Sequence, residues 1–76
     1  MKDRVLKTVS QVLNVPIELL SEESSPDTVA SWDSLKHMNL ILALEEEFGI
    51  QFRDEQIVEI LKVGLIIEAV KELMAA

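Results

Sequence analysis

The chain has 76 residues, enough for one domain, and a domain of this size buries only about 60% of the surface that its unfolded chain exposes. It has no cysteine and one histidine, His37, which excludes disulfides, cysteine-ligated zinc, a cysteine nucleophile and a metal site made of several histidines. No apolar run approaches the roughly 20 residues of a membrane span, and no apolar signal stretch follows the basic amino end. We therefore expect a single domain, residues 1–76, in a soluble cytoplasmic protein.

The charge is strongly acidic and unevenly distributed. The chain has 14 acidic and 7 basic residues, a formal net charge of -7, and no Lys or Arg lies between Lys7 and Lys36. Such a surface repels nucleic acids and anionic membranes and attracts basic patches on proteins. Acidity also keeps a small domain soluble, and charge alone does not separate these two roles.

Hydrophobic periodicity predicts a first helix from Lys2 to Leu13. Its apolar stripe consists of Val5, Leu6, Val9, Val12 and Leu13. Asn14 suits a left-handed C-cap, and Pro16 follows as a stop signal.

Residues 15–33 form a long connection that cannot be helical throughout. It nevertheless contains apolar side chains, among them Ile17, Leu19, Leu20, Val29 and Trp32. We expect these side chains to pin the loop to the core, with Trp32 as its anchor. Long loops of this length that are ordered are usually functional.

The clearest element is a helix from Ser34 to Phe48. Its apolar residues cover several directions, so we expect a central helix with both Leu42 and Leu44 in the core. Gly49 suits its C-cap, with Ile50 folding back in a Schellman arrangement.

The remaining chain predicts a short third helix from about Glu55 to Leu61, capped by Asp54, and a fourth from Val63 to Met74. The inward residues of the fourth helix are expected to be Ile66, Ile67, Val70, Leu73 and Met74. The start of the fourth helix is poorly marked, so the sequence leaves open that the two merge. No segment alternates like a strand. The fold class is therefore all-α: a four-helix bundle with three longer helices, one short helix and a long ordered loop between the first two.

The chemistry-bearing segment is Trp32-Asp33-Ser34-Leu35 at the start of the second helix. A serine hydroxyl there faces backbone N–H groups, and a helix N-terminus favours a bound or attached anion. Asp33 could ligate a divalent cation brought by a modifying enzyme. The alternative is that Asp33 or Ser34 is only an N-cap. His37 stands where a Ser34 capping box would require Glu or Gln, and we assign it no acid–base role.

The helix closes on three consecutive acids, Glu45, Glu46 and Glu47. Negative charge at a helix carboxyl end opposes the dipole by roughly 0.3–1 kcal/mol per charge. We expect Glu45 to be partly covered, and Glu46 and Glu47 to project into water. The triplet is therefore either a docking surface for basic partners or a solvated face.

The assembled pattern resembles acyl carrier proteins over nearly the whole chain. Asp33-Ser34-Leu35 opens the second helix, Leu44-Glu45-Glu46-Glu47-Phe48 closes it, and the Val15-Pro16 stop and the long loop precede it. The resemblance implies a carrier rather than an enzyme, with 4′-phosphopantetheine donated by coenzyme A attached to Ser34 and flanked by Asp33 and Leu35. The arm would carry an acyl or aminoacyl thioester. The alternative is an unmodified acidic interaction module in which Ser34 is only a cap.

The resemblance also implies partners: an Mg2+-dependent phosphopantetheinyl transferase, and loading and acyl-using enzymes with basic patches. Docking residues would be Trp32, Met38, Glu46 and Glu47, on a monomer that binds no nucleic acid, membrane or resident metal. Carriers of fatty acid synthesis usually differ at three positions of this segment, held here by Trp32, Lys36 and Asn39. This departure favours a specialised carrier.

Overall fold

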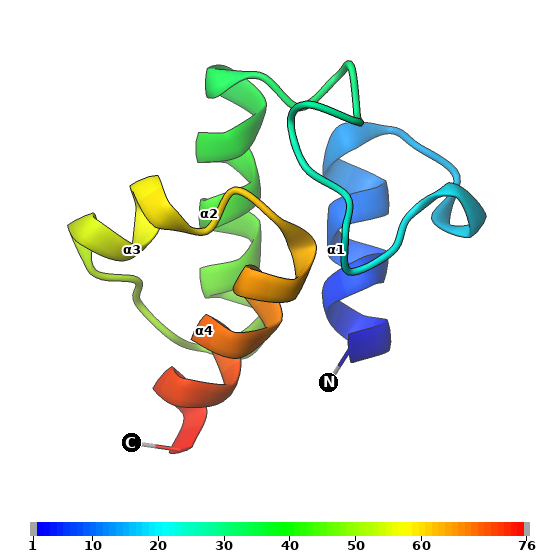
Figure 1. Ribbon diagram of the computed structural model, residues 1–76. Coiled ribbons are helices and arrows are strands. Elements are labelled where there is room, and N and C mark those ends of the chain that lie inside the picture. Colours follow the sequence, from blue (N-terminus) through cyan, green and yellow to red (C-terminus); the bar gives the residue numbers. More distant parts are fainter. Residues whose placement is uncertain (1, 76) are drawn as a thin grey trace.

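The computed structural model describes residues 2–75, which form four α-helices and one short 3-10 helix without any strand. The elements are α1 (Lys2–Leu13), η1 (Ile17–Leu19), α2 (Ser34–Phe48), α3 (Asp54–Glu59) and α4 (Val63–Ala75), shown in Figure 1. The all-α bundle with one short helix and a long first connection is confirmed. None of the helices in this part of the chain is long and apolar enough to cross a bilayer.

One hydrophobic core joins all four helices and the loop. α1 and α2 lie side by side, and α4 contacts α1 (Figure 1). The buried apolar side chains are Val5, Val9, Leu13, Leu20, Val29, Trp32, Leu40, Ile41, Leu44, Phe48, Phe52, Ile60, Val63, Ile66, Ile67, Ala69 and Val70.

The first two long helices end as the sequence predicts. Asn14 has φ 57°, and the Val15 N–H donates to the Ser10 carbonyl at 3.2 Å. Gly49 has φ 65°, and the Ile50 N–H donates to the Glu45 carbonyl at 3.1 Å. Both are Schellman-type ends, in which a residue in the left-handed conformation turns the chain so that carbonyls of the last helical turn accept hydrogen bonds from the N–H groups that follow.

Two predicted core residues lie at the surface instead. Leu42 is 61% exposed and Met74 is 47% exposed, whereas Leu44 is fully buried. The apolar residues of α2 cover more than one face of the helix, and periodicity does not indicate which face the bundle covers. The structure covers the Leu44 face and leaves Leu42 in solvent.

The long loop is pinned by only part of its apolar set. Leu20, Val29 and Trp32 are buried, but Ile17 and Leu19 point outward from η1, a helical turn that the sequence analysis did not predict. Polar contacts also hold the loop: the Ser31 hydroxyl donates to the Leu13 carbonyl at 2.8 Å.

Loop carbonyls also supply the missing start signal of α4. The Val63 and Gly64 N–H groups donate to the carbonyls of Ser24 and Glu22, at 3.0 and 2.8 Å. A Cβ on residue 64 would lie 3.2 Å from the Glu22 carbonyl oxygen, so the close approach favours glycine. Because these acceptors come from a distant segment, local sequence could not mark this helix start.

The third helix is shorter than expected and separate from the fourth. α3 ends at Glu59 rather than Leu61, and residues 60–62 interrupt the helix before α4. Its N-cap is Arg53, with Asp54 as the first helical residue. The Gln56 side-chain oxygen reaches back and accepts from the Arg53 N–H at 2.8 Å, which satisfies the backbone donor just before the helix.

The two leucines of α2 provide a matched test of this core. Leu44→Ala should destabilise the fold by about 2–5 kcal/mol, because it removes fully buried methyl groups. Leu42→Ala should change the free energy of unfolding by no more than about 0.5 kcal/mol, as an exposed substitution. Urea unfolding of both variants measures the difference. If both variants lost the same free energy of unfolding, the face of α2 assigned to the core would be wrong.

Candidate functional site

Asp33, not Ser34, is the N-cap of α2. Asp33 is extended, with φ -103° and ψ -173°, and its Oδ1 accepts from the Lys36 N–H at 2.8 Å. Its carbonyl accepts from the His37 N–H, also at 2.8 Å. Ser34 is the first helical residue, so the interpretation of Ser34 as a helix cap is wrong.

Ser34 is exposed at the positive end of the longest helix. The amides of Ser34 and Leu35 belong to the first turn, where a helix has no carbonyl of its own to offer them. Together with the helix dipole, these donors favour a phosphate held at this hydroxyl. The start of α2 thus presents an exposed hydroxyl next to backbone donors that suit an anion.

A pair of hydrogen bonds through His37 joins three segments next to Ser34. The Trp32 Nε1–H donates to His37 Nδ1 at 3.0 Å, and His37 Nε2 lies 2.7 Å from the Ile57 carbonyl oxygen. An indole nitrogen can only donate, so Nδ1 accepts and the proton lies on Nε2, which donates to Ile57. Both ring nitrogens are therefore occupied, and His37 has a packing role rather than an acid–base role.

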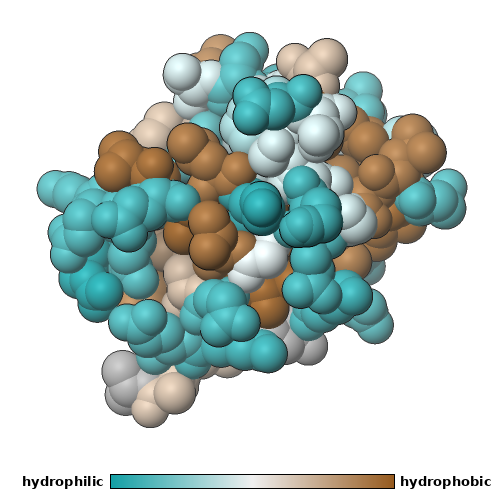
Figure 2. All heavy atoms as spheres, in the orientation of Figure 1, coloured by the Kyte–Doolittle hydropathy of each residue, from teal (hydrophilic) through white to brown (hydrophobic). Residues whose placement is uncertain are grey.

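An open groove of about 520 Å³ lies beside Ser34, between the start of α2 and α3. Its lining residues are Pro26, Trp32, Asp33, Ser34, His37, Met38, Ile57, Val58 and Leu61. Figure 2 shows apolar atoms gathered over α3 and the neighbouring part of α2, and a second apolar cluster over the loop at the opposite side. The serine is thus bordered by an apolar surface rather than by charged groups alone.

The apolar residues near Ser34 divide by burial: Leu35, expected to flank the arm, and Met38 and Trp32, expected to dock. Leu35 and Met38 are 69% and 46% exposed, so both can contact a partner. Trp32 is only 2% exposed, which makes its placement among the docking residues wrong and its role as loop anchor correct. Because the ring is buried, its N–H cannot reach water, and His37 supplies the acceptor.

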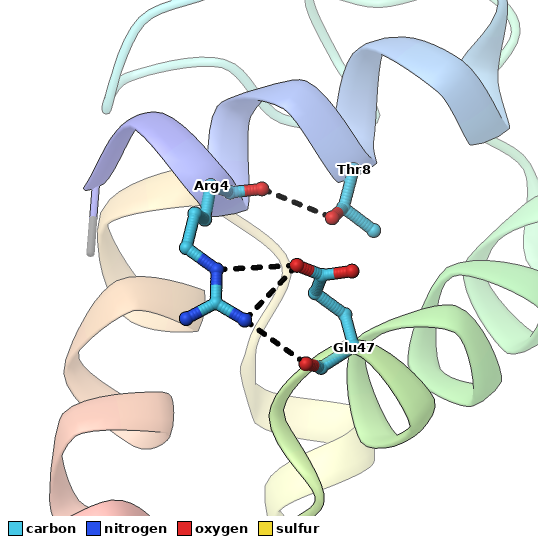
Figure 3. A network of polar contacts seen from close by, with 3 residues as sticks. All are labelled: Arg4, Thr8 and Glu47. Atoms are coloured by element: carbon cyan, nitrogen blue, oxygen red, sulfur yellow. Dashed lines mark hydrogen bonds and ion pairs between the residues drawn. The ribbon is translucent and has the colours of Figure 1, made fainter.

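The three acids at the end of α2 have different surroundings. Glu45 is half-buried, and its Oε2 accepts from the Phe52 N–H at 2.8 Å. Glu47 is exposed but paired with Arg4 of α1. The Arg4 Nε and Nη2 donate to the Glu47 Oε2 at 3.1 and 3.0 Å (Figure 3). Arg4 also lies over the Phe48 ring, 4.6 Å from its centroid. Of these three acids, Glu46 alone is exposed and takes part in none of the ion pairs found within residues 2–75.

Asp33 is the acid nearest the serine in sequence. No group of three His, Asp or Glu side chains within residues 2–75 is placed to hold a metal ion.

Comparison with known proteins defines the class to which this helical domain belongs. Residues 3–70 match the family model described as a phosphopantetheine attachment site. An acyl carrier protein from Sinorhizobium fredii is 36% identical over 73 residues, which cover 96% of this chain and 94% of that one. An acyl carrier protein from Buchnera aphidicola is 38% identical over 52 residues, covering 68% of this chain and 66% of its own.

The fold agrees with a solved structure of the same class. The solution structure of a holo acyl carrier protein from Geobacter metallireducens has a TM-score of 0.87 and 31% identity, covering 97% of this chain and 85% of that one. This chain therefore belongs to the acyl carrier protein family of phosphopantetheine-attachment domains. Proteins of this family are carriers rather than enzymes, and their cofactor is a covalently bound phosphopantetheine.

Sequence reasoning missed the part of the site that α3 and the residues just after it contribute. Ile57 and Val58 of α3 and Leu61 beyond its end line the groove, but they are about twenty residues or more from Ser34 in sequence, and no local pattern links them to it. Arg4 was also missed as the partner of Glu47. A basic residue in the first turn of one helix gives no sign of which acid it will pair with.

The different surroundings of Glu46 and Glu47 predict different effects on stability. Glu46→Lys puts a cation at a helix carboxyl end, which is worth about 0.3–1 kcal/mol, and should keep or raise the melting temperature. Glu47→Lys has the same dipole benefit but also removes the exposed pair with Arg4, worth about 0.2–1 kcal/mol, and adds a repulsive contact, so its melting temperature should lie below that of Glu46→Lys. Thermal unfolding at low and high salt measures both. If both variants change stability alike, the Arg4 pair contributes nothing to the fold.

Proposed function

We propose that Ser34 is the residue to which the phosphopantetheine arm is attached. The observation that carries this is the placement of the hydroxyl: it is exposed, and its residue is the first of α2, directly after the Asp33 cap. Thr8 and Ser24, by contrast, are buried and hydrogen-bonded to neighbouring residues. Ser34 is therefore an accessible hydroxyl at the site where a helix end stabilises a phosphate.

The attachment is a phosphoryl transfer that needs little rearrangement of this chain. The Ser34 oxygen bonds to the phosphorus of the pantetheine phosphate, the adenosine bisphosphate half of coenzyme A leaves, and the hydroxyl proton passes to a base of the transferase. The product is a phosphodiester next to the amides of Ser34 and Leu35. When bound, the arm supplies a thiol that can form a thioester with an acyl or aminoacyl group.

Asp33 is proposed to assist the transferase as well as to cap α2. Its Oδ1 is hydrogen-bonded to the Lys36 N–H, and the rest of the exposed carboxylate can reach a divalent cation bound with coenzyme A. Phosphate and carboxylate oxygens are the ligands that Mg2+ prefers.

The surface around Ser34 supports a carrier that docks on enzymes through apolar contact and one acid. Leu35 and Met38 are exposed beside the serine, and Glu46 is exposed toward the far end of the same helix. We propose that Glu46 meets basic patches on the transferase and on loading and acyl-using enzymes, and that Leu35 and Met38 make the apolar contact with them. Glu47 contributes less because Arg4 already pairs with it.

The pathway proposed is a specialised one rather than housekeeping fatty acid synthesis. The support is the composition of the segment, in which Trp32 precedes Asp33-Ser34 and Lys36 and Asn39 make the first turns of α2 less acidic. We propose that the carrier acts as a cytoplasmic monomer on acyl or aminoacyl cargo.

The attachment predicts a covalent product on one residue. Incubation with coenzyme A, Mg2+ and a broad-specificity phosphopantetheinyl transferase should add one phosphopantetheine to the wild type and none to Ser34→Ala. Intact-mass spectrometry measures both. A wild type that stays unmodified under several transferases would favour the unmodified interaction module, and equal modification of the alanine variant would place the arm on another residue.

The two roles proposed for Asp33, capping α2 and binding the transferase's cation, can be separated by substitution. Asp33→Asn should slow the transferase while leaving the melting temperature nearly unchanged, because asparagine caps helices as well as aspartate does. Asp33→Ala should slow it equally and also destabilise the protein by about 0.5–2 kcal/mol. Initial rates and thermal unfolding of the two variants give the comparison. A normal rate for Asp33→Asn would leave Asp33 with the cap alone.

A further inference from the structure

We propose that His37 determines which cargo this carrier can shelter. By joining Trp32 to Ile57, it closes the inner side of the groove beside Ser34. An acyl group on the arm then remains in the open groove and does not pass between α2 and α3 into the core. The inference rests on the proposed attachment at Ser34.

The groove has an apolar rim and a base closed by hydrogen bonds. Met38, Val58 and Leu61, which line it, are between 45% and 69% exposed, so they form the rim. The lining residues Trp32 and His37 are 2% and 8% exposed, so they can only contribute to the base. Their rings are joined by the hydrogen bond between them, with ring centroids 6.1 Å apart and ring planes 26° from parallel, and both side chains are covered from solvent.

The base resists opening because each polar atom in it has one partner. The Trp32 N–H has the His37 Nδ1, and the His37 Nε2–H has the Ile57 carbonyl. No buried side-chain nitrogen or oxygen within residues 2–75 lacks a hydrogen-bond partner. An alkyl chain moving inward would separate these partners and could not replace either bond, so buried polar groups would be left unsatisfied.

The position of His37 places this barrier under the attachment point. His37 follows Ser34 by three residues, which puts both side chains on one side of α2, about one turn apart. The bond to Ile57 holds α3 at the same point. A short or polar acyl group therefore loses little by staying in the groove, whereas a long alkyl chain stays exposed to water.

The experiment loads the intact protein with arms of different length. A broad-specificity transferase attaches acetyl-, butanoyl- and octanoyl-phosphopantetheine from the corresponding coenzyme A thioesters. Cleavage of each thioester by hydroxylamine is followed by intact-mass spectrometry, since burial of the chain slows cleavage. We expect one rate for all three lengths on the wild type. On His37→Leu we expect octanoyl to be protected relative to acetyl, by up to about fourfold for each methylene group that becomes buried.

Two further variants separate the barrier from a general loss of structure. His37→Gln can accept from Trp32 and donate to Ile57, so it should restore the wild-type, length-independent rates. Trp32→Phe keeps a ring but removes the donor, so it should protect octanoyl as His37→Leu does.

The wild-type series decides the inference even if His37→Leu does not fold. Protection that grows with chain length on the wild type overturns it, and so does a folded His37→Leu with length-independent rates. A wild type that accepts no arm refutes the attachment itself and removes the inference with it. Loading followed by length-dependent protection refutes the inference while leaving the attachment intact.

Discussion

The hydrogen bonds of the His37 ring hold together the part of the molecule on which its function depends. Trp32 ends the long loop, His37 lies in the first turns of α2, and Ile57 lies in α3, so one ring fixes the loop end and the start of α2 to a segment that is distant in sequence. Because the Trp32 indole can only donate, the bond requires one tautomer of His37 and one orientation of both rings. With the loop end fixed, Asp33 is held extended and caps α2, and Ser34 becomes its first helical residue. The exposed serine is therefore presented by a rigid, buried support.

The charges of the chain contribute less to docking than their number suggests. Of the three acids that close α2, Glu45 accepts from the Phe52 backbone and Glu47 pairs with Arg4, so both are used within the fold. These contacts offset part of the cost of placing acids at a helix carboxyl end. Glu46 remains exposed, and the surface close to Ser34 is apolar, at Leu35 and Met38. In the docking proposed for this carrier, charge would steer association from a distance, and apolar contact would select the partner at short range.

Local signals in the sequence predicted most of the helices and the position of Ser34. The bounds of α1 and α2 follow from periodicity and from Asn14 and Gly49, whose left-handed conformations the structure confirms. Features that depend on distant residues could not be predicted. Leu42 is exposed although Leu44 is buried, because packing by other elements decides which apolar face of α2 is covered. The start of α4 is set by carbonyls of the loop, and the groove beside Ser34 needs side chains of α3. These are tertiary contacts, and a helical period contains no information about them.

The central claim is that the arm is carried by Ser34, at the start of α2, and not by any other serine or threonine of the chain. The most direct measurement is a phosphorus–proton correlation NMR spectrum of the pantetheinylated protein, in which the arm's phosphorus couples through bonds to the β-protons of the residue that bears it. The account predicts a correlation from that phosphorus to the Ser34 β-protons and to no other serine or threonine of the chain. A correlation to the side chain of Ser21, Ser25 or Thr28 in the loop instead would contradict it.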